Sequence, residues 1–331
     1  MAIDGMTPVP TVKGWLLASD VREGDYVFGE DGMPQRVALV QLYTPTQMWA
    51  VRFDDGLGIM GDGKLILPVL NRKARKMIAR LDHYKKTDRP YPRKRRAVDT
   101  PLEVLVASDL KVPGSNMSQY TVNCTKPIVY REEPHPVPPF VAGMWAAGRK
   151  TINVPDKYKD YVEAKLAEYG YELKRAPAGN YVIKPDVQKG LLARYTPMPN
   201  SLPLDYYFGT PEQRIELLRG MLVVRSTAYD PETRGFYYES AYRKFPRMLQ
   251  SVVESLGVKT KMYKHKSFTP YTLQFKCALQ LLPDQQKASR LTQYTARYVR
   301  EILPVRPALS AYIETENKTT FAVGEGYIQC R

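Results

Sequence analysis

The stretches PPFVAGMWAAG (residues 138–148) and ELLRGMLVVRS (residues 216–226) decide the fold, because each is a short helix rich in small and apolar residues. Gly143 lies in the first and Gly220 in the second. A glycine inside a helix costs about 1 kcal/mol relative to alanine, so two at matching positions indicate a packing reason. We therefore expect the two helices to pack closely against each other. The alternative is two unrelated core helices with incidental glycines.

The pattern around these helices is α plus β and occurs twice. Before the second helix, TPEQ (residues 210–213) offers a threonine cap, a proline at the first helical position and a glutamine that completes a capping box. After each core helix we expect strand-type alternation and then a peripheral amphipathic helix, ending at Gly170 and at Gly257. Hairpins are expected next, at 171–175 with 181–184 and at 259–265 with 271–276.

Residues 1 to about 70 have a different pattern, of short strands joined by turns. The turn signals are Asp31-Gly32 and Asp54-Asp55-Gly56, between alternating segments such as Met48–Phe53. This predicts an all-β module. Prolines at 134, 136, 138 and 139 predict the boundary with the α plus β region, since proline cannot continue a helix or a central strand.

The net charge of +15 is concentrated locally. Residues 71–96 hold twelve Lys or Arg against two Asp. Clustered cations beside tyrosines favour phosphate binding, because such contacts release counterions from DNA; a solvated basic loop is the other interpretation. A second cationic set, Lys259, Lys261, Lys264 and Lys266, lies at expected exposed strand positions and predicts a basic groove. Pro90 and Pro92 disfavour an amphipathic helix on a membrane.

Cysteine and histidine usage excludes some classes of site. The three cysteines, Cys124, Cys277 and Cys330, form no CxxC pair, and the three histidines have no metal-binding spacing. There is no apolar run that would span a bilayer and no signal peptide. We expect a reduced, cytoplasmic protein with no membrane partner, no metal and no cofactor.

Two longer motifs resemble a known family. The opening DGMTPVPTVKGW (residues 4–15), continued by DVREGDYVF (20–28), resembles the start of a Hint (intein) domain, and FAVGEGYI (321–328) resembles its closing strand. The stretches 138–148 and 216–226 resemble the two signature helices of a LAGLIDADG (DOD-type) homing endonuclease inserted in an intein. The resemblance implies an α+β fold. It consists of an all-β Hint-like domain (1–133 plus 301–331, with a basic insertion at 71–96) and an inserted pseudo-two-fold αββαββα-type domain (134–300, repeats about 134–205 and 206–300).

The acids that make this family a nuclease are missing from the signature helices. In the family each helix ends in an acidic residue, and the pair holds Mg²⁺, a hard cation that needs carboxylate oxygens and stabilises charge at the scissile phosphate. The matching positions here are Gly148 and Arg225. Asp230, Glu232 and Glu239 follow several residues later, and a rescue of metal binding by Asp230 or Glu239 remains the alternative.

The residues of protein splicing are also replaced. The resemblance implies a cysteine or serine at the start, a histidine near residues 63–65 and a terminal His-Asn. The chain has Met1-Ala2, Gly63-Lys64-Leu65 and Cys330-Arg331. We interpret Met1 as a native start and expect a free-standing protein that does not splice.

These expectations combine into one function. We expect a monomeric protein of a phage or mobile element, in the host cytoplasm, that binds double-stranded DNA without cutting it and is not an enzyme. The alternatives are an active Mg²⁺-dependent endonuclease, and an RNA-binding maturase-like or protein-interaction role. The expected DNA contacts are Arg72, Lys73, Arg75, Lys76, Arg93, Lys94, Arg95, Arg96, Lys174, Lys184, Arg225, Lys259, Lys261, Lys264 and Lys276.

Overall fold

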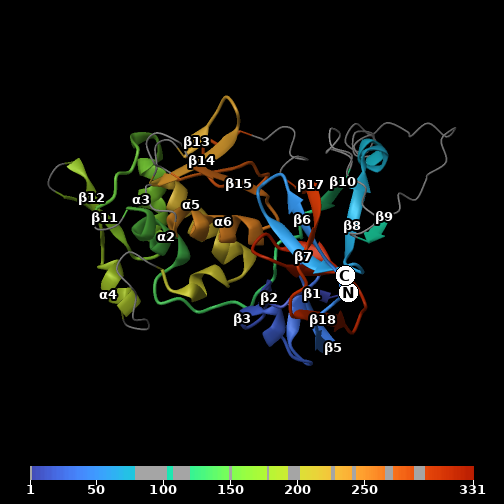
Figure 1. Ribbon diagram of the computed structural model, residues 1–331. Helices are drawn as coiled ribbons and strands as arrows, with labels where there is room; N and C mark the ends of the chain where they lie inside the picture. Colours follow the sequence, from blue (N-terminus) through green and yellow to red (C-terminus); the bar gives the residue numbers. More distant parts are fainter. Residues whose placement is uncertain are drawn as a thin grey trace, which may run out of the picture. The chain divides into compact units, whose positions relative to one another are not determined.

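The computed structural model divides the chain into two compact units (Figure 1). It describes residues 2–78, 103–106, 120–148, 151–176, 179–192, 202–224, 228–240, 244–264, 271–286 and 295–331. Unit 1 comprises residues 1–126 and 295–331, and unit 2 comprises residues 127–294. Among the described residues no helix is long and apolar enough to span a membrane.

Unit 1 is built from β-strands. Twelve of them form one sheet in the order β3-β2-β4-β5-β18-β1-β7-β6-β17-β10-β8-β9, and β19 pairs with β20. The strands are β1 (Ala2–Asp4), β2 (Pro8–Thr11), β3 (Gly14–Leu17), β4 (Tyr26–Phe28), β5 (Pro34–Tyr43), β6 (Met48–Phe53), β7 (Gly58–Asp62), β8 (Ile66–Asn71), β9 (Glu103–Val106), β10 (Tyr120–Asn123), β17 (Ala296–Val305), β18 (Ser310–Thr315), β19 (Phe321–Val323) and β20 (Ile328–Cys330). A 3-10 turn, η1 (Ala18–Asp20), follows β3.

The turns of unit 1 lie where the sequence predicts them. Gly32, between β4 and β5, and Gly56, between β6 and β7, have φ of 80° and 87°, which glycine adopts without strain. The β6–β7 turn itself supplies a buried ion pair: Arg297 Nε lies 2.7 Å from Asp55 Oδ2, and both side chains are almost fully buried. The expectation of an all-β module over residues 1–70 is confirmed apart from η1.

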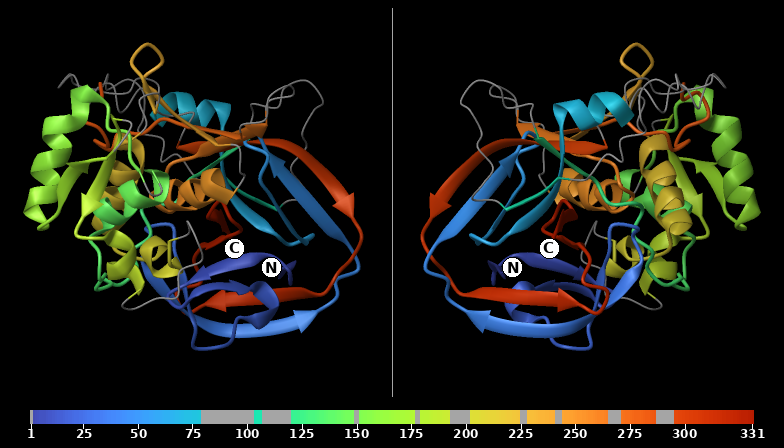
Figure 2. Two further views of the ribbon diagram at one scale, coloured as in Figure 1. Left: turned by 90° about the vertical axis from the view of Figure 1, so that its left-hand side faces the viewer. Right: turned by 90° about the vertical axis from the view of Figure 1, so that its right-hand side faces the viewer.

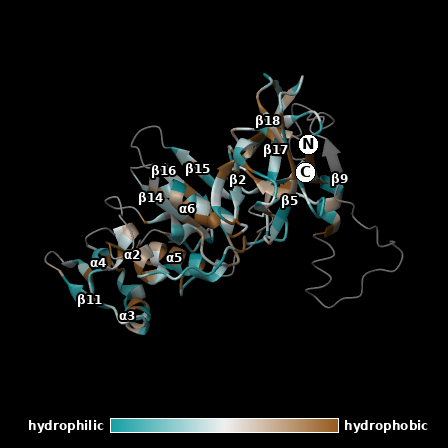
Figure 3. Cartoon of the chain, turned by 90° about the horizontal axis from the view of Figure 1, so that it is seen from below, coloured by the Kyte–Doolittle hydropathy of each residue, from teal (hydrophilic) through white to brown (hydrophobic). Residues whose placement is uncertain are grey.

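Unit 2 contains the helices. They are α2 (Pro139–Gly148), η3 (Asp156–Tyr158), α3 (Lys159–Glu168), α4 (Val187–Leu192), η5 (Leu204–Tyr207), α5 (Pro211–Val223) and α6 (Lys244–Ser255). The strands are β11 (Glu172–Arg175), β12 (Tyr181–Lys184), β13 (Tyr229–Asp230), β14 (Gly235–Ser240), β15 (Thr260–Lys264) and β16 (Tyr271–Phe275). Figure 3 shows teal, hydrophilic residues on β11.

Helices α2 and α5 pack against each other through their glycines, as expected. A Cβ on Gly220 would collide with the Phe140 carbonyl oxygen and lie 3.0 Å from the Met144 nitrogen. Reciprocally, a Cβ on Gly143 would collide with the Leu217 carbonyl oxygen. Both clashes are with backbone, so each glycine is required by the other helix.

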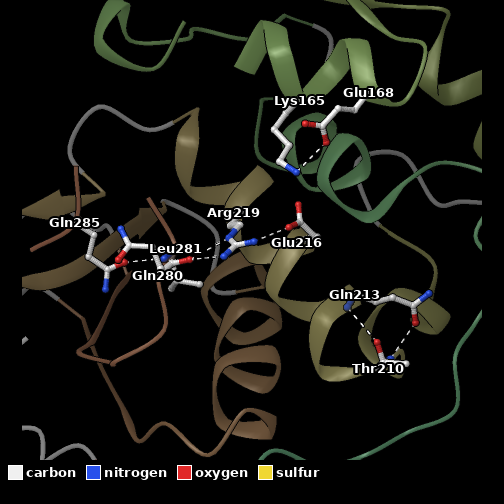
Figure 4. A network of polar contacts seen from close by, with 9 residues as sticks. All are labelled: Lys165, Glu168, Thr210, Gln213, Glu216, Arg219, Gln280, Leu281 and Gln285. Atoms are coloured by element: carbon white, nitrogen blue, oxygen red, sulfur yellow. Dashed lines mark hydrogen bonds and ion pairs between the residues drawn. The ribbon is translucent and has the colours of Figure 1, made fainter. Parts of the chain in front are cut away.

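The start of α5 confirms the predicted capping box. Thr210 Oγ1 accepts a hydrogen bond from the Gln213 nitrogen at 3.3 Å, and Gln213 Oε1 accepts one from the Thr210 nitrogen at 2.9 Å (Figure 4). Further along the helix, Arg219 donates to the Gln280 carbonyl oxygen and to Glu216. The bond to Gln280 fixes α5 against the segment that follows β16, and the bond to Glu216 lies within α5.

The two repeats are not equivalent. The second follows the expected order, with β13 and β14 between α5 and α6 and then β15 and β16, in a four-stranded antiparallel sheet of order β13-β14-β16-β15. The peripheral helices α3 and α6 end near Gly170 and Gly257, whose φ values are 75° and 77°, as predicted.

Strands between α2 and α3 were wrongly predicted. Only residues 149–155 connect α2 to η3, and they supply one isolated bridge, Ile152 with Tyr181. Seven residues are too few for two strands and a turn, since a mean strand alone takes about five or six. The first repeat therefore carries only the β11–β12 hairpin as a sheet among its described residues.

The boundaries between the units differ from the expected ones at 133/134 and 300/301. The first lies at 126/127, before the proline cluster, and the second at 294/295. Strand pairing explains the second difference, because β17 starts at Ala296 and pairs with β10 from its first residue. The proline at 139 instead begins α2.

Candidate functional site

Both ends of the chain lie at the loop between β7 and β8 of unit 1. Ile3 of β1 pairs with Gly61 of β7. On the other side of the loop, Ile66 and Arg331 exchange two backbone hydrogen bonds of 2.9 Å. Figures 1 and 2 show the two termini beside each other in every view. Residues 63–65 therefore connect the strands that hold the two ends.

The side chains near the two chain ends are hydrogen-bonded or buried. Asp62 accepts a hydrogen bond from the Tyr43 hydroxyl at 2.8 Å and from the Lys64 nitrogen at 3.1 Å. Partial burial and the bond to Asp62 raise the pKa of Tyr43 to about 12. Cys330 is fully buried, and burial raises the pKa of its thiol. A buried thiol is a poor nucleophile, because the thiolate is the reactive form.

In unit 2, the end of α2 has no room for an acid. A Cβ on Gly148 would lie 2.8 Å from Ile152 Cγ1, and Ile152 is held by a bridge to Tyr181. The other position, Arg225, lies outside the described residues.

The two candidate rescuing acids lie in the sheet of the second repeat. Asp230 Oδ2 accepts from the Thr233 hydroxyl at 2.6 Å, and this bond lowers the pKa of the Asp230 carboxyl. Glu239 Oε1 accepts from the Thr272 hydroxyl at 3.3 Å. Within the described ranges, no group of three or more His, Cys, Asp or Glu side chains is placed to hold a metal ion.

The sheet of the second repeat has one face in the core and one open face. Phe236, Tyr238, Leu273 and Phe275 belong to the hydrophobic core of unit 2. Strand alternation places the neighbouring residues on the opposite face. We call this the open face; its central members are Tyr237, Glu239, Lys261, Tyr263 and Gln274, together with Thr272, which is buried between its neighbours, and Lys276 follows Phe275.

A hydrogen-bonded chain crosses the open face. Gln274 Nε2 donates to the Tyr237 hydroxyl at 3.0 Å, and that hydroxyl lies 3.2 Å from Thr233 Oγ1. Because the Thr233 hydroxyl donates to Asp230, the Tyr237 hydroxyl donates to Thr233. The chain thus runs in one direction from an amide to a carboxylate, which strengthens each bond and fixes the Gln274 side chain. Lys276 Nζ donates to the Thr233 carbonyl oxygen beside it.

The structure corrects two of the lysines predicted to line a groove. Lys259 is 6% exposed, because β15 begins only at Thr260 and the preceding residues lie in the buried turn after α6. Lys264 lies on the face opposite Lys261, three residues away along the same strand, with its Nζ 5.7 Å from the Tyr271 ring centre. Lys261 lies on the open face, and Lys276, which follows β16, donates to the Thr233 carbonyl oxygen beside it. Lys266 lies outside the described residues.

The hairpin of the first repeat is less cationic than its lysines suggest. Lys174 Nζ lies 2.9 Å from Glu172 Oε1, and Glu172 is directly opposite Lys184 across the hairpin. By strand alternation the three charged side chains share one face. Glu172 is therefore paired with Lys174, and Lys184 occupies the position opposite it.

The structure describes only the first part of the basic segment 71–96. Residues 72–78 are helical, with Arg72, Lys73 and Lys76 exposed. Arg75 is half-buried, donates to the Leu70 carbonyl oxygen at 2.9 Å and lies over the Tyr298 ring, and its burial lowers its pKa. Arg75 therefore contributes to packing. Arg93, Lys94, Arg95 and Arg96 lie outside the described residues.

Sequence reasoning missed Gln274 and Tyr237. Alternation within β14 and β16 puts each on an outward position, but their contact depends on the register between the two strands. The polar alternate residues of two adjacent strands were the available signal.

No family model matches the chain. Over 96% of its length the chain is 25% identical to a replicative DNA helicase DnaB of Mycobacterium intracellulare, and it spans 55% of that protein. Similar solved structures include the MchDnaB-1 intein (34% identical, 20% of this chain and 52% of that chain, TM-score 0.20). Others are the Msm DnaB1 intein splicing domain bound with zinc (34%, 20%, 54%, 0.20) and the gp41-1 intein (23%, 22%, 54%, 0.20).

Proposed function

We propose that the chain is an intein-type protein that binds double-stranded DNA through unit 2 and neither splices nor cuts. Unit 1 is its Hint-like part and unit 2 its LAGLIDADG-like part. The observation that carries the proposal is the reciprocal packing of α2 and α5, in which Gly143 and Gly220 each face the other helix's backbone. This contact pairs the two helices that carry the resemblance and sets the two repeats around them.

The solvent-facing chemistry of unit 2 supports a nucleic-acid partner. The open face presents Lys261 and Lys276 together with tyrosines and a fixed amide. Lysines neutralise phosphates, and amides and tyrosines hydrogen-bond or stack on bases. The chain matches a DnaB helicase, and two of the similar inteins carry DnaB in their names. These matches support a relation to inteins of DNA-handling proteins.

The loss of cleavage follows from the ends of the core helices. Gly148 has no carboxylate, and Ile152 occupies the space where one would begin. Asp230 is engaged by Thr233 in its own turn. The proposal therefore assigns no pair of metal-binding carboxylates to the ends of α2 and α5.

The loss of splicing follows from the convergence in unit 1. The β7–β8 loop, which holds both ends, has Gly63-Lys64-Leu65 where a histidine would activate the first peptide bond. The nearest thiol, Cys330, is fully buried. Hydroxyl and thiol nucleophiles need an adjacent base or a lowered pKa.

Duplex binding at increasing salt tests the DNA part. The full chain is titrated with a mixed-sequence duplex, and the log of the affinity should fall linearly with the log of the salt concentration. Binding that is absent at low salt or insensitive to salt contradicts the proposal. Cleavage of the same duplex in Mg²⁺, lost in Asp230→Ala or Glu239→Ala, would instead show an active nuclease.

A fusion tests the splicing part. The chain is placed between two folded marker domains, and the expected product is the intact three-part precursor. Joined markers with release of the chain would overturn this conclusion.

A further inference from the structure

Unit 1 has a pocket of about 290 Å³ whose walls come from three segments, within residues 4–8, 57–60 and 324–328. Pockets that hold small molecules measure about 300–1,000 Å³, so this one suits a single side chain. We propose that the pocket receives a lysine side chain of a partner polypeptide, with the lysine ammonium bound at Asp4. The proposal concerns unit 1 alone and does not depend on duplex binding.

The pocket forms where β1 ends and the neighbouring strand β7 continues. After Asp4 the chain bends to the β18 side of β1, where the Gly5 nitrogen donates to the Leu309 carbonyl oxygen at 2.8 Å. The Gly324 nitrogen donates to the Pro8 carbonyl oxygen at 2.7 Å, which holds the β19–β20 turn beside the residues that follow β1. The first half of β7 therefore borders a pocket between these two segments.

The walls of the pocket are acidic in a chain whose net charge is +15. Asp4 and Glu325 line it, and among its described lining residues there is no Lys or Arg. The cation beside this wall, Arg297, is already paired with Asp55 at 2.7 Å. The local charge therefore favours a cationic occupant and disfavours a phosphate or a carboxylate.

Asp4 is the acid that carries the proposal, because it is only 7% exposed. Its Oδ1 accepts a hydrogen bond from the Met6 nitrogen at 3.1 Å. Within the described part of the chain no Lys or Arg pairs with this carboxylate. Burial of a carboxylate that lacks a counter-charge costs free energy, and a bound ammonium would remove that cost.

The remaining walls fit a hydrocarbon stem. Leu57, Ile59 and Ile328 line the pocket, together with Met6 and Met60, which are 69% and 39% exposed. A lysine buries its four-carbon stem along apolar surface and keeps its ammonium at a polar group. Exposed methionines are common on surfaces that bind polypeptides, because their side chains adapt to the partner. These residues favour a side chain of a polypeptide over a free amine.

The oxygens of the pocket suit lysine better than arginine. One carboxylate oxygen of Asp4 is used by the turn, which leaves Oδ2 for an occupant. The Thr7 hydroxyl is in the same wall and is a second acceptor. A guanidinium binds best to both oxygens of one carboxylate, whereas an ammonium is a compact charge with three donors in different directions. The geometry of the acceptors therefore favours an ammonium.

A peptide titration of the full chain, labelled with ¹³C at its methionine methyl groups, tests the proposal. The probe is the tripeptide acetyl-Gly-Lys-Gly-amide, and the matched uncharged probe carries acetyl-lysine in its place. The lysine peptide should shift the methyl resonances of Met6 and Met60 in a saturable manner. The acetylated peptide should bind on the order of ten- to a hundredfold more weakly, since it lacks the charge-assisted bond.

Variants locate the ammonium. Asp4→Asn keeps an oxygen for the Met6 nitrogen and removes the charge, so it should weaken the lysine peptide by the same factor. Asp20→Asn, which changes an exposed acid outside the pocket, is the control and should bind as the original chain does. If Asp4→Asn does not fold, the two peptides compared on the original chain decide the question.

Four results would overturn the proposal. The first two are equal binding of both peptides and the absence of shifts at Met6 and Met60. The third is tighter binding of n-butylammonium or of the arginine tripeptide, which would assign the pocket to a free amine or to arginine. The last is a shift of the same two methyl groups when the protein alone is concentrated, which would make a second copy of this chain the occupant.

Discussion

Replacing Gly220 by alanine tests the contact on which the arrangement of unit 2 depends. The new Cβ would lie 2.9 Å from the Phe140 carbonyl carbon and 3.0 Å from the Met144 nitrogen, and would collide with the Phe140 carbonyl oxygen. All three atoms are backbone, so relief requires α2 and α5 to move apart. On an open helix surface the same change would stabilise by about 1 kcal/mol.

Overpacking in a core costs about 1–3 kcal/mol, so after the gain from alanine the net effect of Gly220→Ala is a loss of up to about 2 kcal/mol. Gly148→Ala is the matched comparison, because its Cβ would meet only side-chain atoms of Ile152 and no backbone atom. Gly143→Ala should resemble Gly220→Ala. The double variant should lose less than the sum, since the helices are already separated in either single variant.

The free energy of unfolding in urea, monitored by hydrogen exchange at the backbone amides of α2 and α5, measures these changes in stability. These amides report on unit 2 and not on unit 1. The expected order of stability is the original chain, then Gly148→Ala, then Gly220→Ala. A Gly220→Ala chain as stable as the original, with unchanged exchange in α2, would refute the close packing of the two helices.

Three further predictions concern stability. Asp55→Asn should lower the free energy of unfolding of unit 1 in urea by about 3–5 kcal/mol, because it leaves the buried Arg297 guanidinium without its counter-charge. The control Arg52→Ala, which breaks the exposed pair with Glu301, should cost about 0–1 kcal/mol. Equal losses from the two variants would contradict this account. Thr210→Ala should destabilise α5 by about 1 kcal/mol, and unchanged exchange protection in its first turn would count against the capping box. Burial of Asp284 opposes ionisation, but hydrogen bonds from Lys157 and Tyr158 outweigh it and lower the Asp284 pKa below 3.8. The stability that Asp284 contributes is therefore present above pH 3.8 and is lost as the pH falls through the lowered pKa. Asp284→Asn should be less stable than the original chain at neutral pH and should lack this loss of stability in acid. If the stability of the variant falls with pH as that of the original chain does, the linkage is excluded.

Much of unit 2 was predictable because local signals coincide there. The glycines of the core helices predict their contact, the TPEQ stretch predicts the capping box, and Gly170 and Gly257 predict the ends of the peripheral helices. Each of these features depends on a few neighbouring residues or on one simple packing rule. The sequence also shows that the connection 149–155 has only seven residues. Strands were wrongly predicted there because the two repeats were expected to have the same order of elements.

The candidate site was less predictable because it depends on register and on strand ends. Lys259 looks like an exposed strand residue, and it is buried because β15 starts one residue later. The chain of bonds from Gln274 to Asp230 requires the pairing of β14 with β16, which no periodicity in either strand specifies. The convergence of the chain ends likewise depends on pairing between segments about 60 and more than 250 residues apart.

Hydrogen exchange of the full chain with and without a duplex tests the central claim most directly. Duplex binding should slow exchange in residues 235–240, 260–264 and 271–275. Binding that leaves β14, β15 and β16 unprotected would contradict the assignment of the open face as the DNA-binding surface.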